Sequence, residues 1–543
     1  MRANPHELRY AWFVGLIALL TTTLACNASH LGNPEEQGSQ ATYPPTTSIS
    51  RPTLTPGPTP TPQPTLSAPS DDFTAFEYAM RPEYAEDLKQ YPVAARYSLD
   101  VTISFKDDNS VTLIGRELIH YTNRQTLALD SLVLMLWPNA EHQYLSDMTL
   151  ESVRVDGQER SFDLEQKGLV ARIPLSPPLA PGESVEVGAK FVVAAFPVTE
   201  GDRSARFGVV QNVLLAPTFY PLIPHLTPEG VWQTHPASPG GSATNSDSAL
   251  YVWRVSAPAQ APWGGASGAD LAIVGTGSVI ETAQAGGLQT QTFVTGPMRD
   301  LALVVGPFER TQRIVDGIVL NAYVLADQAG RAEAILNYAQ GQLTHLQAVV
   351  GPYPFRELDL PHVPGIQGGM EYPGVALIGS VSEAYFFEVT VAHEVGHQWF
   401  YGLVGSDPVS EPWLDESAAS YTEVLYAEAV YGLEAAAERL RQAQDFVRFA
   451  DHPAWPIGWP TEAYGWENDY GIILYMKGKL FFDALRRQLG DETFFAFLRH
   501  YNTVYRYGFA TAADFQAAAE STCACDLDDL FNLWVYEGGS VKP

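Results

Sequence analysis

Two histidines and a glutamate stand close together in the segment His393-Glu394-Val395-Gly396-His397. On a helix, residues four positions apart project from one face, so both imidazoles can bind a single metal ion. Glu394 follows the first histidine directly and lies beside that metal without binding it. Because neutral imidazole is a good zinc ligand, this spacing predicts a zinc site.

A catalytic zinc needs three protein ligands and one position open to water, so an acidic third ligand is expected on a second helix. Glu416 fits, because 18 residues separate it from His397. Two turns further along the same helix face, Glu423 is either an acceptor that orients a ligand histidine or a solvent-facing acid. We therefore expect one zinc per chain, bound by His393, His397 and Glu416.

The residue types also indicate what such a site can do. Zinc makes a bound water more acidic, and Glu394 is placed to take the proton of that water and pass it to a leaving amine. Attack on a peptide carbonyl creates an oxyanion, which needs one further hydrogen-bond donor. The predicted chemistry is therefore peptide hydrolysis.

Two other motifs flank this segment, namely Gly368-Gly369-Met370-Glu371 and Tyr475-Met476-Lys477-Gly478. With the histidine motif and Glu416, they occur in the order found in the aminopeptidase N-type gluzincins, and the chain resembles that family from about Tyr97 to Val541. The resemblance implies an aminopeptidase with a thermolysin-like catalytic domain and a zinc cleft between a helical and a mixed lobe. The large C-terminal helical domain of longer members is expected to be missing.

The resemblance also implies residue roles. Tyr475 matches the family's catalytic tyrosine and would donate to the oxyanion, and its alternative is a core aromatic on a helix. Glu371 matches the acid that pairs with the free α-amine of a peptide, and its alternative is an acid that only lines the cleft. The family has Asn where this chain has Tyr372, and Pro373 follows, so the amine pocket differs. The other substrate-binding residues implied are Gly368, Gly369 and Met370.

Three functions remain open from the sequence. The first is a zinc aminopeptidase that trims peptides from their N-termini. The second keeps the zinc chemistry but cuts internal bonds or opens other electrophiles such as epoxides. The third is an inactive, tethered zinc-binding protein, which Glu394 and Tyr475 argue against because binding alone requires neither.

The N-terminus predicts export. Arg2 and Arg9 precede an apolar run from Ala11 to Leu20, which is about half of the ~20 residues that a membrane-spanning helix needs. Residues 1–26 are expected to be a signal peptide, and Thr23-Leu24-Ala25-Cys26 resembles a bacterial lipobox, in which the cysteine carries a lipid. Thr23 stands where an aliphatic residue is usual, so secretion without a lipid is the alternative. The expected location is the outer face of a bacterial membrane.

Composition and periodicity predict the remaining organisation. Residues 27–72 are rich in Pro, Thr and Ser, as in an extended stalk. Alternating residues at 97–105 and strand-like runs at 111–121, 132–137 and 185–193 predict an antiparallel all-β domain over 90–295. Helical spacing at 332–350, a short strand at 357–363 and helices beyond Phe387 predict a thermolysin-like, mainly helical peptidase domain over 296–543.

Charge and cysteine content limit the partners. The chain carries 62 acidic and 32 basic residues, a formal charge of -30, which argues against a nucleic acid partner. Its three cysteines cannot form a disulfide framework. Cys523 and Cys525 are expected to be two small buried thiols rather than a local disulfide or metal ligands. The sequence does not indicate an oligomeric state.

Overall fold

The computed structural model describes residues 73–90, 94–140, 144–198, 206–236, 244–262, 268–363, 365–366, 368–381, 383–464 and 469–539. The predicted signal peptide and stalk lie outside these residues. The described residues belong to one compact unit. Within them, no helix combines the length and the apolar character that crossing a bilayer requires.

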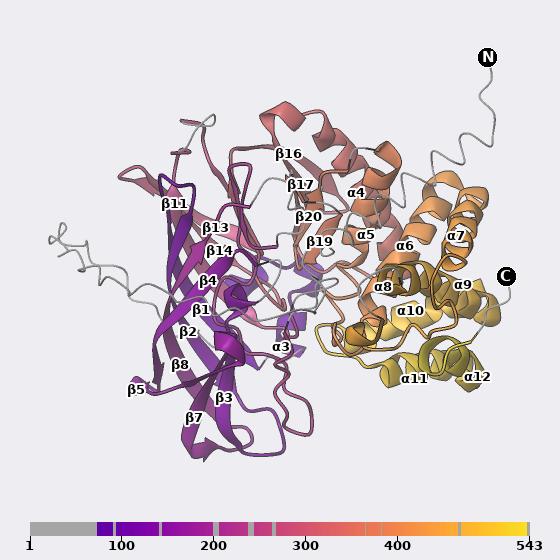
Figure 1. Ribbon diagram of the computed structural model, residues 1–543, viewed down its shortest axis with the longest axis horizontal. Coiled ribbons are helices and arrows are strands. Elements are labelled where there is room, and N and C mark those ends of the chain that lie inside the picture. Colours follow the sequence, from indigo (N-terminus) through magenta and orange to yellow (C-terminus); the bar gives the residue numbers. More distant parts are fainter. Residues whose placement is uncertain are drawn as a thin grey trace, which may run out of the picture. The chain divides into compact units, whose positions relative to one another are not determined.

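An eight-stranded sheet forms most of the first half of the described chain (Figure 1). The predicted strands at 97–105, 111–121 and 185–193 are confirmed as β1, β2 and β8. Along β2 buried residues alternate with less buried ones, as expected for a strand with one face on the core. In spatial order the strands are β13 (Ser278–Ala285), β14 (Leu288–Val294), β11 (Leu250–Pro258), β1 (Ala95–Phe105), β2 (Val111–Thr122), β8 (Ser184–Ala195), β4 (Ser146–Val155) and β5 (Gln158–Arg160).

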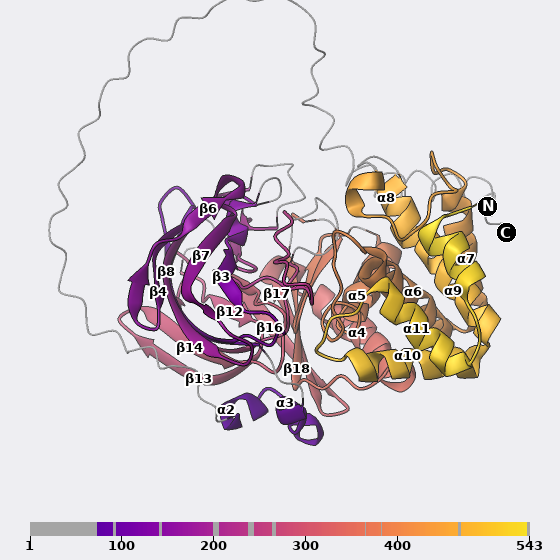
Figure 2. The same cartoon turned by 90° about the horizontal axis from the view of Figure 1, so that it is seen from below.

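Two smaller sheets complete this β region, and the eight-stranded sheet curves around them (Figure 2). One large apolar cluster joins residues of all three sheets, with Trp253 and Phe191 fully buried in it. One small sheet has the spatial order β3 (Leu129–Met135), β7 (Val170–Leu179) and β6 (Asp163–Glu165). The other has the order β12 (Ala272–Gly275), β15 (Leu303–Gly306), β10 (Val213–Leu215) and β9 (Gly208–Val210).

Two details of the β prediction were wrong. The strand expected to reach Trp137 ends at Met135, and a 3-10 turn follows over Trp137–Asn139, because Pro138 has no N–H to donate to a ladder. The domain is also not purely antiparallel, since β1 pairs with β11 in parallel. No tight hairpin joins these two strands, so chain connectivity does not force them to be antiparallel.

The second half of the described chain is mainly helical, which confirms the predicted fold class. A mixed five-stranded sheet precedes most of the helices, and its β18 (Glu357–Val363) confirms the predicted short strand. The predicted helix at 332–350 is confirmed as α4 (Arg331–Val349). In spatial order the sheet is β16 (Phe308–Val315), β17 (Ile318–Leu325), β18, β20 (Val375–Gly379) and β19 (Gly369–Tyr372), which leaves β19 at an edge.

The helices that follow pack beside this sheet, with α4 and α5 nearest to it (Figure 1). Trp413 is fully buried, and its ring contacts Phe481 and Phe515 of two other helices. The longer helices are α5 (Ala384–Gly396), α6 (Trp413–Tyr431), α7 (Leu433–Val447), α9 (Gly478–Leu489), α10 (Asp491–Tyr505) and α11 (Ala512–Cys523). The short ones are α8 (Asp469–Gly471), α12 (Asp528–Phe531) and the π-helices η8 (Ile472–Lys477) and η9 (Asn532–Tyr536), whereas α2 (Thr74–Glu77) and α3 (Asp87–Gln90) precede β1.

The chain passes from the β region to the helical region at β15 and β16. β15 still pairs with β10 and β12, whereas β16 begins the sheet beside the helices. The boundary between 295 and 296 stays a prediction, because both regions belong to one compact unit.

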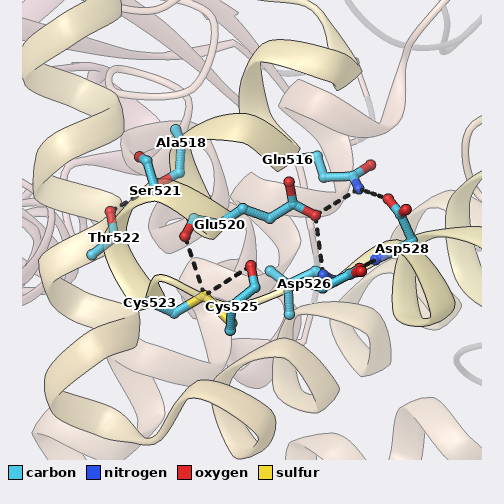
Figure 3. The surroundings of a disulfide bond; sticks show 10 residues. Gln516, Ala518, Glu520, Ser521, Thr522, Cys523, Cys525, Asp526 and Asp528 are labelled. Atoms are coloured by element: carbon cyan, nitrogen blue, oxygen red, sulfur yellow. Dashed lines mark hydrogen bonds between the residues drawn. A yellow bond between two sulfur atoms is a disulfide. The ribbon is translucent and has the colours of Figure 1, made fainter.

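The expectation of two free thiols was wrong. Cys523 and Cys525 form a disulfide at the end of α11 (Figure 3). Ala524 between them adopts a left-handed conformation with φ of 51°, which reverses the chain after the helix and brings the two sulfurs together. Cys525 is exposed rather than buried.

Candidate metal centre

The two histidines lie at the C-terminal end of α5. His393 is in the last turn, and His397 caps the helix with φ of -62° and ψ of -16°, so the helical spacing is kept. Their Nε2 atoms are 3.0 Å apart. The two rings therefore place their Nε2 atoms close enough to bind one metal ion.

The third predicted ligand comes from α6, a helix whose residues 413–427 are all buried. Glu416 lies in its first turn, and its Oε2 atom is 3.4 Å from His393 Nε2 and 3.5 Å from His397 Nε2. The structure thus brings together the three residues that the spacing predicted.

Two features let α5 and α6 approach closely enough for this. Gly396 faces Thr422, and a Cβ atom at Gly396 would come within 2.2 Å of the Thr422 hydroxyl. Gln342 of α4 is fully buried and donates to the carbonyl oxygens of Ala392 on α5 and Thr422 on α6. The glycine within the histidine motif is therefore a packing requirement.

The hydrogen bonds of the two rings determine what the cluster can hold. His393 Nδ1 faces Glu423 Oε1 at 3.0 Å, and His397 Nδ1 faces the carbonyl oxygen of Phe400 at 3.1 Å. Both partners only accept, so each Nδ1 carries a proton, and in the neutral form of each ring the Nε2 atom presents a bare lone pair. Two nitrogen lone pairs and a carboxylate oxygen then face one another, which is the donor set of a catalytic zinc site.

The electrostatic surroundings favour a cation. Burial alone would lower the pKa of His393, but the carboxylates of Glu416 and Glu423 outweigh it and raise that pKa to about 9. The pKa of His397 is also raised to about 9, because Glu416 outweighs burial. Burial opposes the charge of Glu416, yet the two histidines hold its pKa well below the usual range. The site stabilises positive charge at the point where the three ligand atoms meet.

Glu423 is an acceptor for a ligand histidine and not a solvent-facing acid. Its side chain is buried, and besides His393 it accepts a 2.7 Å bond from Lys479 Nζ. Lys479 reaches it because Gly478, at the start of α9, packs against Ser417, where a Cβ atom would not fit. The ammonium balances the carboxylate, so a buried charge does not stay uncompensated.

Glu394 lies between the zinc ligands and the edge strand β19. A Cβ atom at Gly369 would come within 2.4 Å of the Glu394 carboxyl group, so this glycine makes room for it. Glu394 Oε2 is buried and has no hydrogen-bond partner among the described residues. Burial, reinforced by the nearby Glu371, raises the pKa of Glu394 well above its usual value. The carboxyl group of Glu394 therefore holds a proton more readily than an ordinary glutamate.

Tyr475 lies in the π-helix η8, and its ring stacks on His393 with centroids 5.7 Å apart. It is therefore part of the metal centre and not a remote core aromatic. Ser417 Oγ donates to the Leu474 carbonyl oxygen, and Lys477 Nζ donates to the carbonyl oxygens of Pro453 and Trp455. These bonds fix the helix segment that presents the phenol.

Glu371 lies on β19, where it pairs with Ala376 of β20, and its side chain is buried. It contributes to the electrostatic surroundings of Glu394 and Tyr475. Met370 is half-buried beside it on the same strand, and Gly368 precedes the strand with φ of 72°. Pro373 and Gly374 form the two-residue turn after Tyr372, which is how the departure from the family motif is accommodated.

Three residues of the centre were missed by reasoning from the sequence. They are Gln342, Lys479 and Gln398, and the last of these lies between the histidine helix and the β19–β20 hairpin. The position of Gln398 directly after His397 was an available signal. The sequence around Gln342 and Lys479 contains no such signal, because only the packing of separate helices brings these two residues to the site.

Comparison with known proteins agrees with this geometry. Residues 347–534 match the sequence model of the peptidase family M1 domain. Aminopeptidase M1-B of rice is 26% identical over 299 residues, which are 50% of this chain and 33% of that protein. Aminopeptidase N of Streptomyces lividans is 26% identical over 269 residues, which are 44% of this chain and 30% of that protein. The chain thus spans about a third of the length of the curated relatives it matches.

The fold is also found among solved structures. The M1 zinc metallopeptidase of Deinococcus radiodurans superposes with a TM-score of 0.62 at 21% sequence identity, covering 83% of this chain and 96% of that one. On the sequence match over residues 347–534 and the ligand cluster, this part of the chain is similar to the M1 family of zinc metallopeptidases.

The cluster predicts the metal content of the purified protein. We expect about one zinc per chain. We expect His397→Ala to weaken zinc binding by more than ~100-fold, because the two remaining ligands hold zinc poorly. Even the loss of a residue that only contacts a ligand typically lowers metal affinity about 10- to 100-fold. Chelator competition followed by metal analysis measures this. His500→Ala, on the exposed face of α10, is the control and should bind zinc like the wild type. Full zinc content in His397→Ala would contradict the assignment.

Proposed function

We propose that this chain is an aminopeptidase that removes N-terminal residues from peptides. The observation that carries the proposal is the pair of buried carboxyl groups Glu394 and Glu371, which lie near enough for the charge of Glu371 to act on Glu394, while Gly369 of the Glu371 strand packs against Glu394. One is suited to move a proton, and the other offers a buried negative charge. The aminopeptidase relatives support the same reading.

The positions of the side chains indicate which chemical role each residue would have in hydrolysis. Zinc, when bound, supplies a Lewis acid and a water that loses its proton near neutral pH. Glu394 would act as the base that accepts a proton from the attacking water and passes it to the leaving amine. Tyr475, whose ring stacks on His393, would donate from its hydroxyl to the oxygen on which negative charge develops.

Glu371 gives the proposal its substrate class. A buried carboxylate near the reacting groups attracts the ammonium of a free peptide N-terminus, and a charge-assisted bond in a dry site is strong. Its strand β19 is an edge strand, and its charge acts on both Glu394 and Tyr475, so an ammonium bound at Glu371 would lie near the groups proposed to react. A peptide whose amine is acetylated lacks this interaction.

The proposal is tested with Glu371→Ala on one peptide in its free and N-acetylated forms. For the free peptide we expect a loss of about 2 to 5 kcal/mol in transition-state binding, or at least ~30-fold in kcat/KM, because a buried charge loses its partner. The slow rate on the acetylated peptide should change little. Glu462→Ala, at an exposed acid, is the control and should leave both rates unchanged. Efficient wild-type cleavage of the acetylated peptide at internal bonds would show an endopeptidase instead.

We also propose that the protein is exported and anchored by a lipid on Cys26, at the outer face of a bacterial membrane. The apolar N-terminal run, the lipobox-like segment and the Pro-rich residues 27–72 support this. The disulfide between Cys523 and Cys525 supports export as well, because such bonds persist mainly in oxidising compartments.

The anchor is tested by membrane fractionation of cells that express the full chain. Native protein should sediment with membranes, and Cys26→Ser should release it or block its maturation, because no thiol remains to carry the lipid. Cys525→Ser removes another cysteine and should stay with the membranes. Unchanged membrane association of Cys26→Ser would exclude the lipid anchor.

A further inference from the structure

The side chain of Gln398 joins the end of the zinc-binding helix to the turn of the β19–β20 hairpin. Its Nε2 donates to the Tyr372 carbonyl oxygen at 3.2 Å, and its Oε1 accepts from the Gly374 N–H at 2.9 Å. The residue is 1% exposed, so both bonds lie in a dry environment. The amide thus bonds to both an acceptor and a donor at the single turn of this hairpin.

Gln398 is itself held rigidly. It follows the ligand His397 directly, its N–H donates to the Val395 carbonyl oxygen, and its own carbonyl oxygen accepts from Leu403 N–H. Gly402 packs against this carbonyl, where a Cβ atom would come within 2.8 Å. Any movement of the side chain amide relative to the zinc ligands is therefore restricted.

The β19–β20 hairpin needs contacts outside the sheet to hold its outer strand in place, and the bonds to Gln398 supply two of them. Its strand β19 lies at the edge of the sheet and pairs only with β20 among the described strands. Toward the start of β19, Gly369 packs against Glu394, and at the turn Gly374 is held by Gln398. Glu371 lies between these two points of contact. The position of Glu371 relative to the metal centre thus depends on the contacts that hold the turn.

We propose that Gln398 is a positioning residue, which holds the hairpin that carries Glu371 at a fixed place relative to the zinc ligands and so makes cleavage depend on a free α-amine. This inference rests on the proposed aminopeptidase function. If the hairpin shifts, an ammonium bound at Glu371 no longer brings the first peptide bond to the reacting groups. Misplacement by about 1 Å can cost ~100-fold in rate, so two hydrogen bonds at the turn are enough to matter.

The test compares Gln398→Met with the wild type on one peptide in its free and N-acetylated forms. Methionine has a similar length but makes neither hydrogen bond. We expect zinc to stay at about one per chain and the ratio of kcat/KM for the free over the acetylated peptide to fall at least ~10-fold. A merely structural loss would lower both rates by the same factor and leave that ratio unchanged.

Gln342→Met is the matched control, because Gln342 is also a buried glutamine that donates to α5 but does not contact the hairpin. It should lower stability and both rates together, with the ratio unchanged. If Gln398→Met does not fold, Gln398→Glu keeps an acceptor for Gly374 N–H and puts a carboxylate oxygen against the Tyr372 carbonyl, so the ratio should still fall. An unchanged ratio in a folded, zinc-loaded Gln398 variant would overturn the inference. A wild-type ratio near one would instead overturn the aminopeptidase proposal.

Discussion

Three electron-pair donors face one another in a buried space at the centre of this protein, and their mutual repulsion is the constraint on which the surrounding structure depends. His393 Nε2, His397 Nε2 and Glu416 Oε2 lie 3.0 to 3.5 Å apart. Such a set is unfavourable unless a cation lies among them, and two imidazoles with one carboxylate are a donor set that suits zinc. The bonds at each Nδ1 then hold the rings in the tautomer that binds metal.

The packing around the centre follows from this constraint. Burying several acidic side chains near one another is costly, so each charged one needs a cation or a hydrogen-bond donor beside it. Glu423 accepts a hydrogen bond from Lys479, and Glu416 lies at the proposed metal position. Glu394 keeps a buried oxygen that has no hydrogen-bond partner among the described residues. Glycines at the contacts between elements allow these groups to come so close, as Gly396 and Gly369 illustrate.

The sequence predicted the parts that depend on local spacing. A helix places residues four apart on one face, so the two histidines needed no tertiary information, and the strand at 357–363 followed from its composition. The parallel pairing of β1 and β11 and the bond from Lys479 to Glu423 depend on contacts distant in sequence, which periodicity does not encode. The disulfide was missed because two cysteines one residue apart join only if the residue between them reverses the chain, as Ala524 does.

The central claim is that Glu394 moves the proton in hydrolysis at the zinc centre. Glu394→Gln keeps the size of the side chain and removes its basicity, and the kcat of this variant on a free-amine peptide, with zinc measured in the same sample, tests the claim most directly. The account predicts about one zinc per chain and a kcat at least ~100-fold below that of the wild type. A zinc-loaded Glu394→Gln protein with a kcat within a few-fold of the wild type would contradict it.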